Sequence, residues 1–205
     1  MQRFSEQQRA LLLSVARTAL INCLLREQRP SEAAQAAVEA ALAAQPQTAN
    51  PADPAISSEM LLAPAACFVT LWQGAHGNLR GCRGEFTPHQ PLIEAVAQMA
   101  LATALDDPRF APVTAAEVPQ LRIEISVLSP LRPIRPEEIE IGRHGLLIAR
   151  GRQRGLLLPE VPVEHHMDVE TFLDALCWKA GLREGDWRDP ETALWAFETE
   201  AWEEP

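Results

Sequence analysis

The sequence predicts an α+β fold with a mainly antiparallel β-sheet and flanking helices. Two observations carry this prediction: short apolar runs pair across turns as hairpins do, and the helical segments do not alternate regularly with strands. The chain has 205 residues, 47% of them hydrophobic and 22% charged, as in a soluble globular protein. We expect one domain over 1–205, made of N-terminal helices (1–44), a surface linker (45–64) and an α+β body (65–205).

Two helices are expected before the linker. Residues 5–26 place apolar side chains at helical spacing, and residues 31–44 are rich in Ala. Ser31 follows Pro30 and is the expected N-cap of the second helix. Residues 45–64 are rich in Pro, Ala and Asn, so no regular element is expected there.

The first hairpin follows the linker. Residues 66–72 form an apolar strand, 74–78 a turn and 79–86 the return strand. Pro91 opens a helix with apolar residues at helical spacing, and this helix is expected to stop at Asp106-Asp107-Pro108, because the residue before Pro disfavours helix.

The remaining elements follow from capping signals and from alternation. A capping box at 114–117 predicts a helical turn, and 121–128 alternates as a half-buried strand does. A second hairpin is expected with strands at 146–149 and 155–158. A helix capped by Asp168 and closed by Gly181 follows, and residues 193–202 are expected to form a final strand.

Composition narrows the classes of partner. Lys and Arg total 18 against 28 Asp and Glu, so the formal net charge is -10, and we expect no nucleic-acid partner. The N-terminal helix is interrupted by Arg9 and Arg17, unlike a signal peptide, and no run approaches the roughly 20 apolar residues of a membrane span. We expect no membrane partner.

Four widely spaced cysteines indicate reduced thiols and a cytoplasmic location.

No cofactor is predicted, because the sequence has no phosphate-binding loop, dinucleotide fingerprint or Ser-His-Asp arrangement. His165 and His166 are adjacent, with Glu164 and Asp168 nearby, but their spacing matches no common metal motif. We expect no metal site.

The candidate functional site is the hexapeptide Leu79-Arg80-Gly81-Cys82-Arg83-Gly84. Its thiol lies between two glycines and two arginines, and a thiolate is the reactive form of cysteine. On a strand, residues 80 and 82 share a face and 83 points the other way, so Arg80 is the expected cation beside Cys82. The alternative is that Cys82 is a small buried residue, as free cysteines commonly are.

Two residues are candidate bases for this thiol. Glu124 lies on the polar face of an expected strand, and His144 lies in a Gly-rich turn. A solvated carboxylate and a turn histidine are the simpler interpretations. Asp106-Asp107-Pro108-Arg109-Phe110 could bring a carboxylate and a guanidinium together, and the simpler interpretation is a helix stop with a local ion pair.

These segments together resemble the AMMECR family, whose prokaryotic members are called AmmeMemoRadiSam system protein A. The resemblance rests on segments that occur in the family's order: Phe68–Leu71, Leu79–Cys82, Asp107–Phe110, Ile123–Leu128, Gly142 with His144–Leu146, Leu158–Val161, and Phe172-Leu173 through Lys179–Leu182. One departure is Arg83, which stands where the family has Ile.

The resemblance implies an α+β fold in two unequal lobes, with residues 79–84 lining a cleft between them that suits a ligand. It also implies a Memo-like protein and a radical S-adenosylmethionine (SAM) enzyme as partners, while the family's own reaction is unsettled. Two functions stay open. One is a module binding a small molecule, peptide or partner protein at Leu79, Arg80, Gly81, Cys82, Arg83 and Gly84. The other is an enzyme or modification module that uses Cys82 as nucleophile or acceptor, with Arg80 stabilising the thiolate.

Overall fold

The computed structural model describes residues 4–44, 59–74 and 77–205. The chain divides into two compact units. We call residues up to 127 together with 200–205 the larger unit, and residues 128–199 the smaller unit. Both units combine antiparallel strands with helices, so the predicted α+β class is confirmed.

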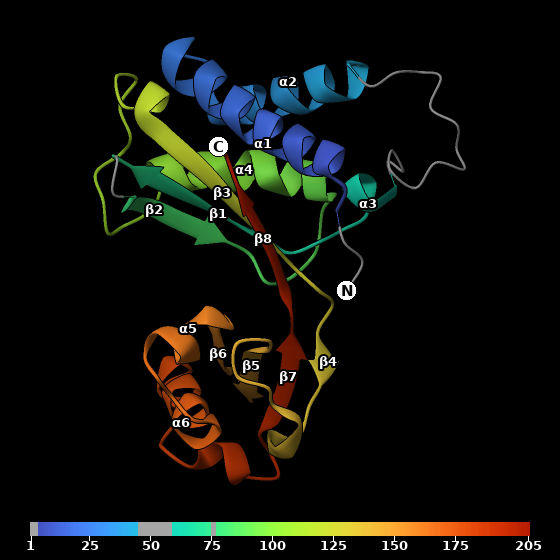
Figure 1. Ribbon diagram of the computed structural model, residues 1–205, viewed down its shortest axis with the longest axis vertical. Helices are drawn as coiled ribbons and strands as arrows, with labels where there is room; N and C mark the ends of the chain where they lie inside the picture. The colour runs from blue at the N-terminus through green and yellow to red at the C-terminus, as the bar shows by residue number, and fades with distance from the viewer. Residues whose placement is uncertain (1–3, 45–58, 75–76) are drawn as a thin grey trace. The chain divides into compact units, whose positions relative to one another are not determined.

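The larger unit contains a four-stranded sheet in the order β2-β1-β3-β8 (Figure 1). Its strands are β1 (Cys67–Gln73), β2 (Asn78–Gly84), β3 (Leu121–Leu128) and β8 (Thr199–Glu203). The central strand β1 pairs antiparallel with both β2 and β3. The expected first hairpin is therefore present, and β2, which carries the hexapeptide, is an edge strand of the sheet.

The described residues of this unit form the helices α1 (Glu6–Leu20), α2 (Pro30–Ala43), α3 (Glu59–Leu62) and α4 (Leu92–Leu105). A π-helical turn over Ile21–Leu25 continues α1. Helices α1, α2 and α4 pack against one another, and α4 also packs against β1 and β2 (Figure 1). As predicted, α4 starts after Pro91 and ends at Asp106.

Alternation along β1 and β3 decides which face of the sheet meets the helices. Val69, Leu71, Ile123 and Ile125 have no exposed side-chain surface and belong to the core that also contains residues of α1, α2 and α4. Because side chains of a strand alternate between faces, their neighbours Thr70 and Glu124 lie on the opposite face. This opposite face is only half-buried.

Two expectations about the N-terminal region are wrong. Helix α2 begins at Pro30 with Arg29 as its N-cap, not at Ser31, because the fixed φ of proline suits the first helical position. In its described part, residues 59–64, the linker contains a helical turn, α3, whose Leu61 is buried in the core. An apolar side chain that finds a core site is enough to order one turn. The rest of the predicted linker, 45–58, lies outside the described residues.

The first helix is more apolar than the sequence analysis allowed. Glu6–Leu25 is the one helix among the described residues that is long and apolar enough to cross a membrane by length and composition. The sequence argument looked for an uninterrupted apolar run and therefore missed this helix. Its few charged residues break the run but lower the mean hydropathy only slightly. In this structure Leu12, Val15, Ala16 and Leu20 are buried against the other helices, as in the core helix of a globular protein.

The smaller unit has its own sheet, in the order β4-β7-β5-β6. The strands are β4 (Arg132–Pro133), β5 (Gly145–Arg150), β6 (Gln153–Leu157) and β7 (Ala193–Phe197). The predicted second hairpin is β5–β6. Strand β4 was not predicted, because two residues carry no periodicity.

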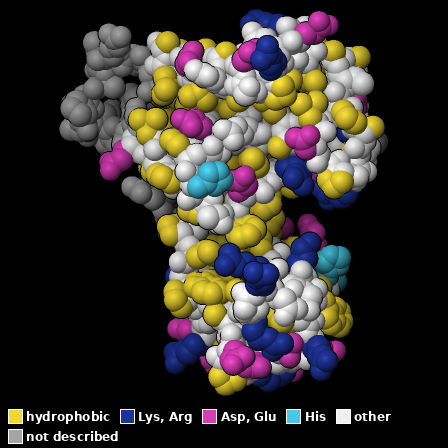
Figure 2. All heavy atoms as spheres, turned by 180° about the vertical axis from the view of Figure 1, so that it is seen from behind, with side chains coloured by type: hydrophobic (Ala, Val, Ile, Leu, Met, Phe, Trp, Pro, Cys, Tyr) yellow, Lys and Arg dark blue, Asp and Glu magenta, His cyan; other side chains and the backbone are white. Residues whose placement is uncertain are grey.

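Two helices accompany this sheet, α5 (Glu160–Glu164) and α6 (Val169–Lys179). As expected, the Asp168 side chain caps α6, accepting the backbone N–H of Thr171 at 2.8 Å. Acidic and basic side chains are interspersed on the face of this unit that Figure 2 shows. Arg150, for example, pairs with Asp186 at 3.0 Å and with Asp189 at 3.2 Å.

The C-terminal segment differs from its prediction. Residues 193–202 were expected as one strand, but they form β7 in the smaller unit and β8 in the larger unit. Ala193–Phe197 pairs with β5, whereas Trp202 is buried in the core of the larger unit. Apolar residues fill 193–197 and recur at 201 and 202, so the sequence pattern shows no sign that the partner sheet changes.

Candidate functional site

The hexapeptide begins with a bulge in β2. Leu71 pairs with Gly81 and Trp72 pairs with Leu79, so Arg80 is an extra residue without a partner position on β1. A bulge turns side chains away from simple alternation. Arg80 therefore does not follow the rule that residues 80 and 82 share a face, on which its expected role depended.

The two glycines of the hexapeptide make room for their own neighbours. A Cβ at Gly81 would lie 2.8 Å from the carbonyl oxygen of Thr103 in α4, and a Cβ at Gly84 would lie 2.3 Å from the ring of Phe68. Close packing inside the unit therefore requires both glycines. Exposure of the strand backbone to a partner is not needed to explain them.

Asp107 and Arg109 hold the backbone of Cys82 at the outer edge of β2. The Asp107 carboxylate accepts the Cys82 N–H at 2.9 Å, and Arg109 Nη2 donates to the Cys82 carbonyl at 3.2 Å. Arg109 also pairs with Asp107 at 2.7 Å. We call this arrangement the Asp107–Arg109 clasp. It gives Cys82 the two backbone hydrogen bonds that a further strand would supply.

Thr103, near the end of α4, links this helix to strands β1 and β2. Its hydroxyl accepts the Arg83 N–H at 3.1 Å and lies 2.9 Å from the carbonyl oxygen of Val69, the residue paired with Arg83. It also lies 2.7 Å from the carbonyl of Met99, so its single hydrogen serves one of these carbonyls at a time. The end of α4 thus holds β2 at two consecutive residues, 82 and 83.

The Cys82 side chain is half-buried, and the Thr70 hydroxyl donates to its sulfur at 3.3 Å. Burial raises the pKa of the Cys82 thiol above its usual value; the Thr70 hydrogen bond and Arg109 oppose this rise, and Asp107 and Glu124 add to it. The thiol form is therefore favoured at neutral pH. The cation that acts on this sulfur is Arg109, which sequence reasoning treated only as part of a local ion pair.

Arg80 has other partners. Its Nε donates to Glu117 at 2.7 Å and its Nη2 donates to the carbonyl of Ala111 at 3.0 Å. The Arg80 guanidinium and the backbone N–H of Thr114 hold the pKa of Glu117 down at about 2. Arg80 thus fastens the segment after α4 to β2. Half of the capping box predicted at 114–117 is present: the Glu117 carboxylate accepts the Thr114 N–H, but the Thr114 hydroxyl donates to that carboxylate and the Glu117 N–H donates to the Thr114 carbonyl instead.

The face of β2, β1 and β3 opposite the helices carries the remaining candidates. We call it the Cys82 face; its half-buried residues are Phe68, Thr70, Trp72, Cys82 and Glu124. Thr70 pairs with Cys82 on one side and with Glu124 on the other, so these three residues form a row across three strands. With about 4.8 Å between strands, the backbones of Cys82 and Glu124 are about 10 Å apart. Trp72 Nε1 donates to the Glu124 carboxylate at 2.9 Å.

Arg83, which stands where the family has Ile, is exposed. Leu79 is 38% exposed at the start of the hexapeptide. The binding residues expected from sequence therefore divide into two groups. Leu79, Cys82 and Arg83 present side chains to solvent at least in part, whereas Gly81, Gly84 and Arg80 are used by internal contacts.

His144 belongs to the smaller unit and is buried, with 1% of its surface exposed. Its Nδ1 accepts the backbone N–H of Glu140 at 3.1 Å, and its Nε2 lies 2.8 Å from Arg132. Burial lowers the pKa of the imidazole. These contacts are those of a structural histidine, and the expectation of a solvated turn histidine is wrong because the turn folds back on its own backbone.

The other chemical groups are dispersed. Cys67 and Cys177 are buried, and burial raises the pKa of Cys67 to about 12. His165 and His166 are exposed at the end of α5. Within residues 4–44, 59–74 and 77–205, no three His, Cys, Asp or Glu side chains come together as metal ligands would.

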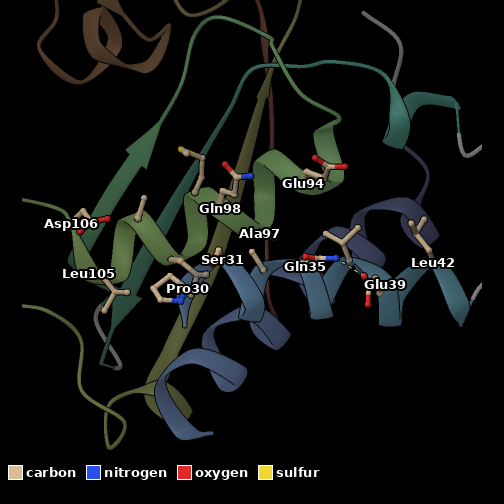
Figure 3. A pocket seen from close by; sticks show the side chains of 15 residues that line it. Pro30, Ser31, Gln35, Glu39, Leu42, Glu94, Ala97, Gln98, Leu105 and Asp106 are labelled. Atoms are coloured by element: carbon tan, nitrogen blue, oxygen red, sulfur yellow. Dashed lines mark hydrogen bonds between the residues drawn. The ribbon is translucent and has the colours of Figure 1, made fainter. Parts of the chain in front are cut away.

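A groove of about 810 Å³ lies between α2 and α4 (Figure 3). It is lined by residues of these two helices from Pro30 to Leu42 and from Glu94 to Asp106. Sequence reasoning did not find it. The available signal was the Ala-rich composition of both helices, whose small side chains leave a depression where longer ones would fill the surface.

Comparison with known proteins gives one family. The AMMECR1 family model matches residues 31–202. Proteins of Thermococcus gammatolerans and Thermococcus kodakarensis are 47% and 48% identical over 132 residues, which are 62% of this chain and 64% of each relative. A protein of Methanococcus aeolicus is 40% identical over 148 residues, 69% of this chain and 74% of that protein. The match thus spans less than two thirds of the length of the two Thermococcus relatives.

A solved structure is similar over most of the chain. The crystal structure of an uncharacterized protein from Pyrococcus horikoshii superimposes with a TM-score of 0.73 at 36% sequence identity. The similarity covers 94% of this chain and 89% of that chain. At this identity and coverage the whole α+β architecture, and not one unit alone, is shared.

Proposed function

The chain belongs to the AMMECR1 family, and from that premise we propose that it is a binding module whose ligand site is the Cys82 face of the larger unit. The observation that carries this proposal is the state of Cys82. Its sulfur accepts a hydrogen bond from Thr70 and its pKa is raised by burial, so it is a poor nucleophile at neutral pH. The ligand is a small molecule, a peptide or a segment of a partner protein.

The Cys82 face has the features of a prepared binding site. An indole and a phenyl ring provide apolar contact area, while a hydroxyl, a thiol and a carboxylate provide polar contacts. The Asp107–Arg109 clasp and the Thr103 hydroxyl keep the strand in place, which limits the entropy lost when a ligand binds. Leu79 adds exposed apolar surface at the edge.

The second candidate is an enzyme or modification module with Cys82 as nucleophile or acceptor. One observation favours it: Arg109 lies close enough to lower the pKa of the thiol, although burial outweighs this effect. Glu124 is the candidate base on the same face, and a water molecule or a ligand group would have to bridge the distance across β1, the strand between them. In this version Arg109, not Arg80, would stabilise the thiolate.

The pH dependence of Cys82 alkylation separates the two functions. We expect iodoacetamide to label Cys82 with a midpoint above about 8.5, the value of a free thiol. Intact mass and peptide mapping give the rate at each pH, the Cys82→Ser variant identifies the signal, and half-buried Cys23 is the internal comparison. A midpoint well below that value would contradict the binding-only function and favour the nucleophile.

A Memo-like protein and a radical SAM enzyme are the proposed partners, within the cytoplasm. Copurification of the three proteins tests this. We expect the Leu79→Glu variant to lose partners that dock on the Cys82 face, because it places a charge in exposed apolar surface. The control is Val163→Glu, a similarly exposed position in the smaller unit. If no complex forms with the wild-type chain, these partners have no support.

A further inference from the structure

The groove between α2 and α4 has an apolar floor. Small and medium side chains from both helices form this floor: Ala34, Val38, Ala97, Leu101 and Ala102. The two helices run in opposite directions along it, with Pro30 beside Leu105 at one end, and Glu94 toward the end where Glu39 and Leu42 lie (Figure 3). An apolar trough between two helices is the shape that accepts a third helix.

The rim of the groove is acidic. Its charged residues are Glu39 on α2, Glu94 on α4 and Asp106 directly after α4, with the amides of Gln35 and Gln98 between them (Figure 3). Among the described residues that line it, there is no Lys, Arg or His. Arg29, next to Pro30, is already paired with Glu32 at 3.7 Å. A ligand that covers the floor therefore meets carboxylates of both helices.

We propose that this groove is the docking site of a basic amphipathic helix from a partner protein. Leucine-like side chains on one face of that helix fill the trough, and Lys or Arg on its flanks pair with the rim carboxylates. From Glu94 to Asp106 the lined part of α4 is about 18 Å long, which fits roughly three turns of the docked helix. Charge complementarity selects a basic partner helix over an acidic one.

This docking site is separate from the proposed ligand site. Met99, Ala102 and Asp106 line the groove, whereas Thr103 and Asp107 of the same segment hold β2. The inference therefore does not depend on what binds at the Cys82 face. A failure of one proposal leaves the other in place.

The test uses the full chain and a synthetic helix of about 14 residues, held helical by a staple, with leucines on one face and lysines beside them. Fluorescence anisotropy measures its binding. The matched probe has glutamate in place of every lysine. We expect the lysine peptide to bind, with an affinity that falls as salt rises, and the glutamate peptide not to bind.

Charge reversal on the rim gives the decisive comparison. The Glu39→Lys/Glu94→Lys variant should bind the lysine peptide at least about tenfold more weakly and should gain affinity for the glutamate peptide. The control is Glu164→Lys/Glu184→Lys, which changes the net charge equally at exposed positions of the smaller unit. Circular dichroism confirms that each variant is folded.

Backbone amide shifts in an NMR titration locate the bound peptide. Shifts confined to α2 and α4 support the proposal. The proposal is overturned if the lysine peptide does not bind, if both peptides bind equally, if the two charge-reversal variants behave alike, or if the shifts fall on the Cys82 face.

Discussion

At Gly81 the strand that carries Cys82 passes α4 with no room for a methyl group. The nearest atoms are the carbonyl oxygen and Cγ2 of Thr103, 2.8 and 3.0 Å from a Cβ built at this position. Two residues further, Arg83 points to solvent, where the resemblance led us to expect an apolar family residue. Two positions of one strand, 81 and 83, thus differ sharply in how much change they tolerate.

The Gly81→Ala variant tests this. We expect it to lose about 1–3 kcal/mol of unfolding free energy, because either β2 or α4 must move to admit the methyl group. Urea denaturation measures the loss. Arg83→Ile is the matched control in the same strand, and its stability should change by no more than about 0.5 kcal/mol. Equal stability of Gly81→Ala and the wild type would contradict the close approach.

At the level of elements, the segment after α4 replaces a missing neighbour strand for β2. Asp107 holds the backbone of Cys82, and Glu117 holds the side chain of Arg80. Hydrogen bonds from Arg109 keep the pKa of Asp107 well below its usual value, and Arg80 keeps that of Glu117 at about 2. An otherwise exposed strand edge is thereby covered by charged side chains.

These two carboxylates predict acid sensitivity. Each has a lower pKa in the folded than in the unfolded chain, so its stabilisation is fully present above about pH 5 and is lost as pH falls through 4 toward 2. Asp107→Asn/Glu117→Gln should be less stable at pH 7 and should lose less of its unfolding free energy over that range. Urea denaturation at several pH values measures both. Parallel pH curves for variant and wild type would contradict the assignment.

At the level of the whole molecule, the chain leaves the larger unit after residue 127 and returns at residue 200. The returning segment is held by several contacts. Glu200 pairs with Arg9 at 2.7 Å, Glu204 accepts from Arg17 Nε at 3.0 Å, and Trp202 is buried beside Phe4. The last six residues therefore belong to the stability of the larger unit.

Removal of residues 200–205 should destabilise the larger unit selectively. We expect the loss to reach at least about 3 kcal/mol, the cost of removing one buried Trp side chain. Hydrogen exchange followed by mass spectrometry should show faster exchange in peptides from 4–127 and little change in 128–199. Removal of Pro205 alone, which is exposed, is the control. Equal acceleration in both units would contradict this division.

The sequence by itself determined most elements. Alternation over 121–128, the paired apolar runs of the first hairpin, the Pro91 start and the Asp168 cap each predicted an element that the structure contains. These signals are local, because burial of one face repeats with the period of the helix or strand and caps satisfy nearby backbone groups. The hexapeptide was also recognisable, since its residue types are unusual together.

Only the tertiary structure decided which side chains and strands contact one another. Arg109 and Asp107 reach Cys82 from more than twenty positions away, Arg80 turns to Glu117, and the tail divides between two sheets. No local period records such contacts, because they depend on which surfaces pack together after each element has formed. For the same reason the α2–α4 groove exists only where two Ala-rich helices meet.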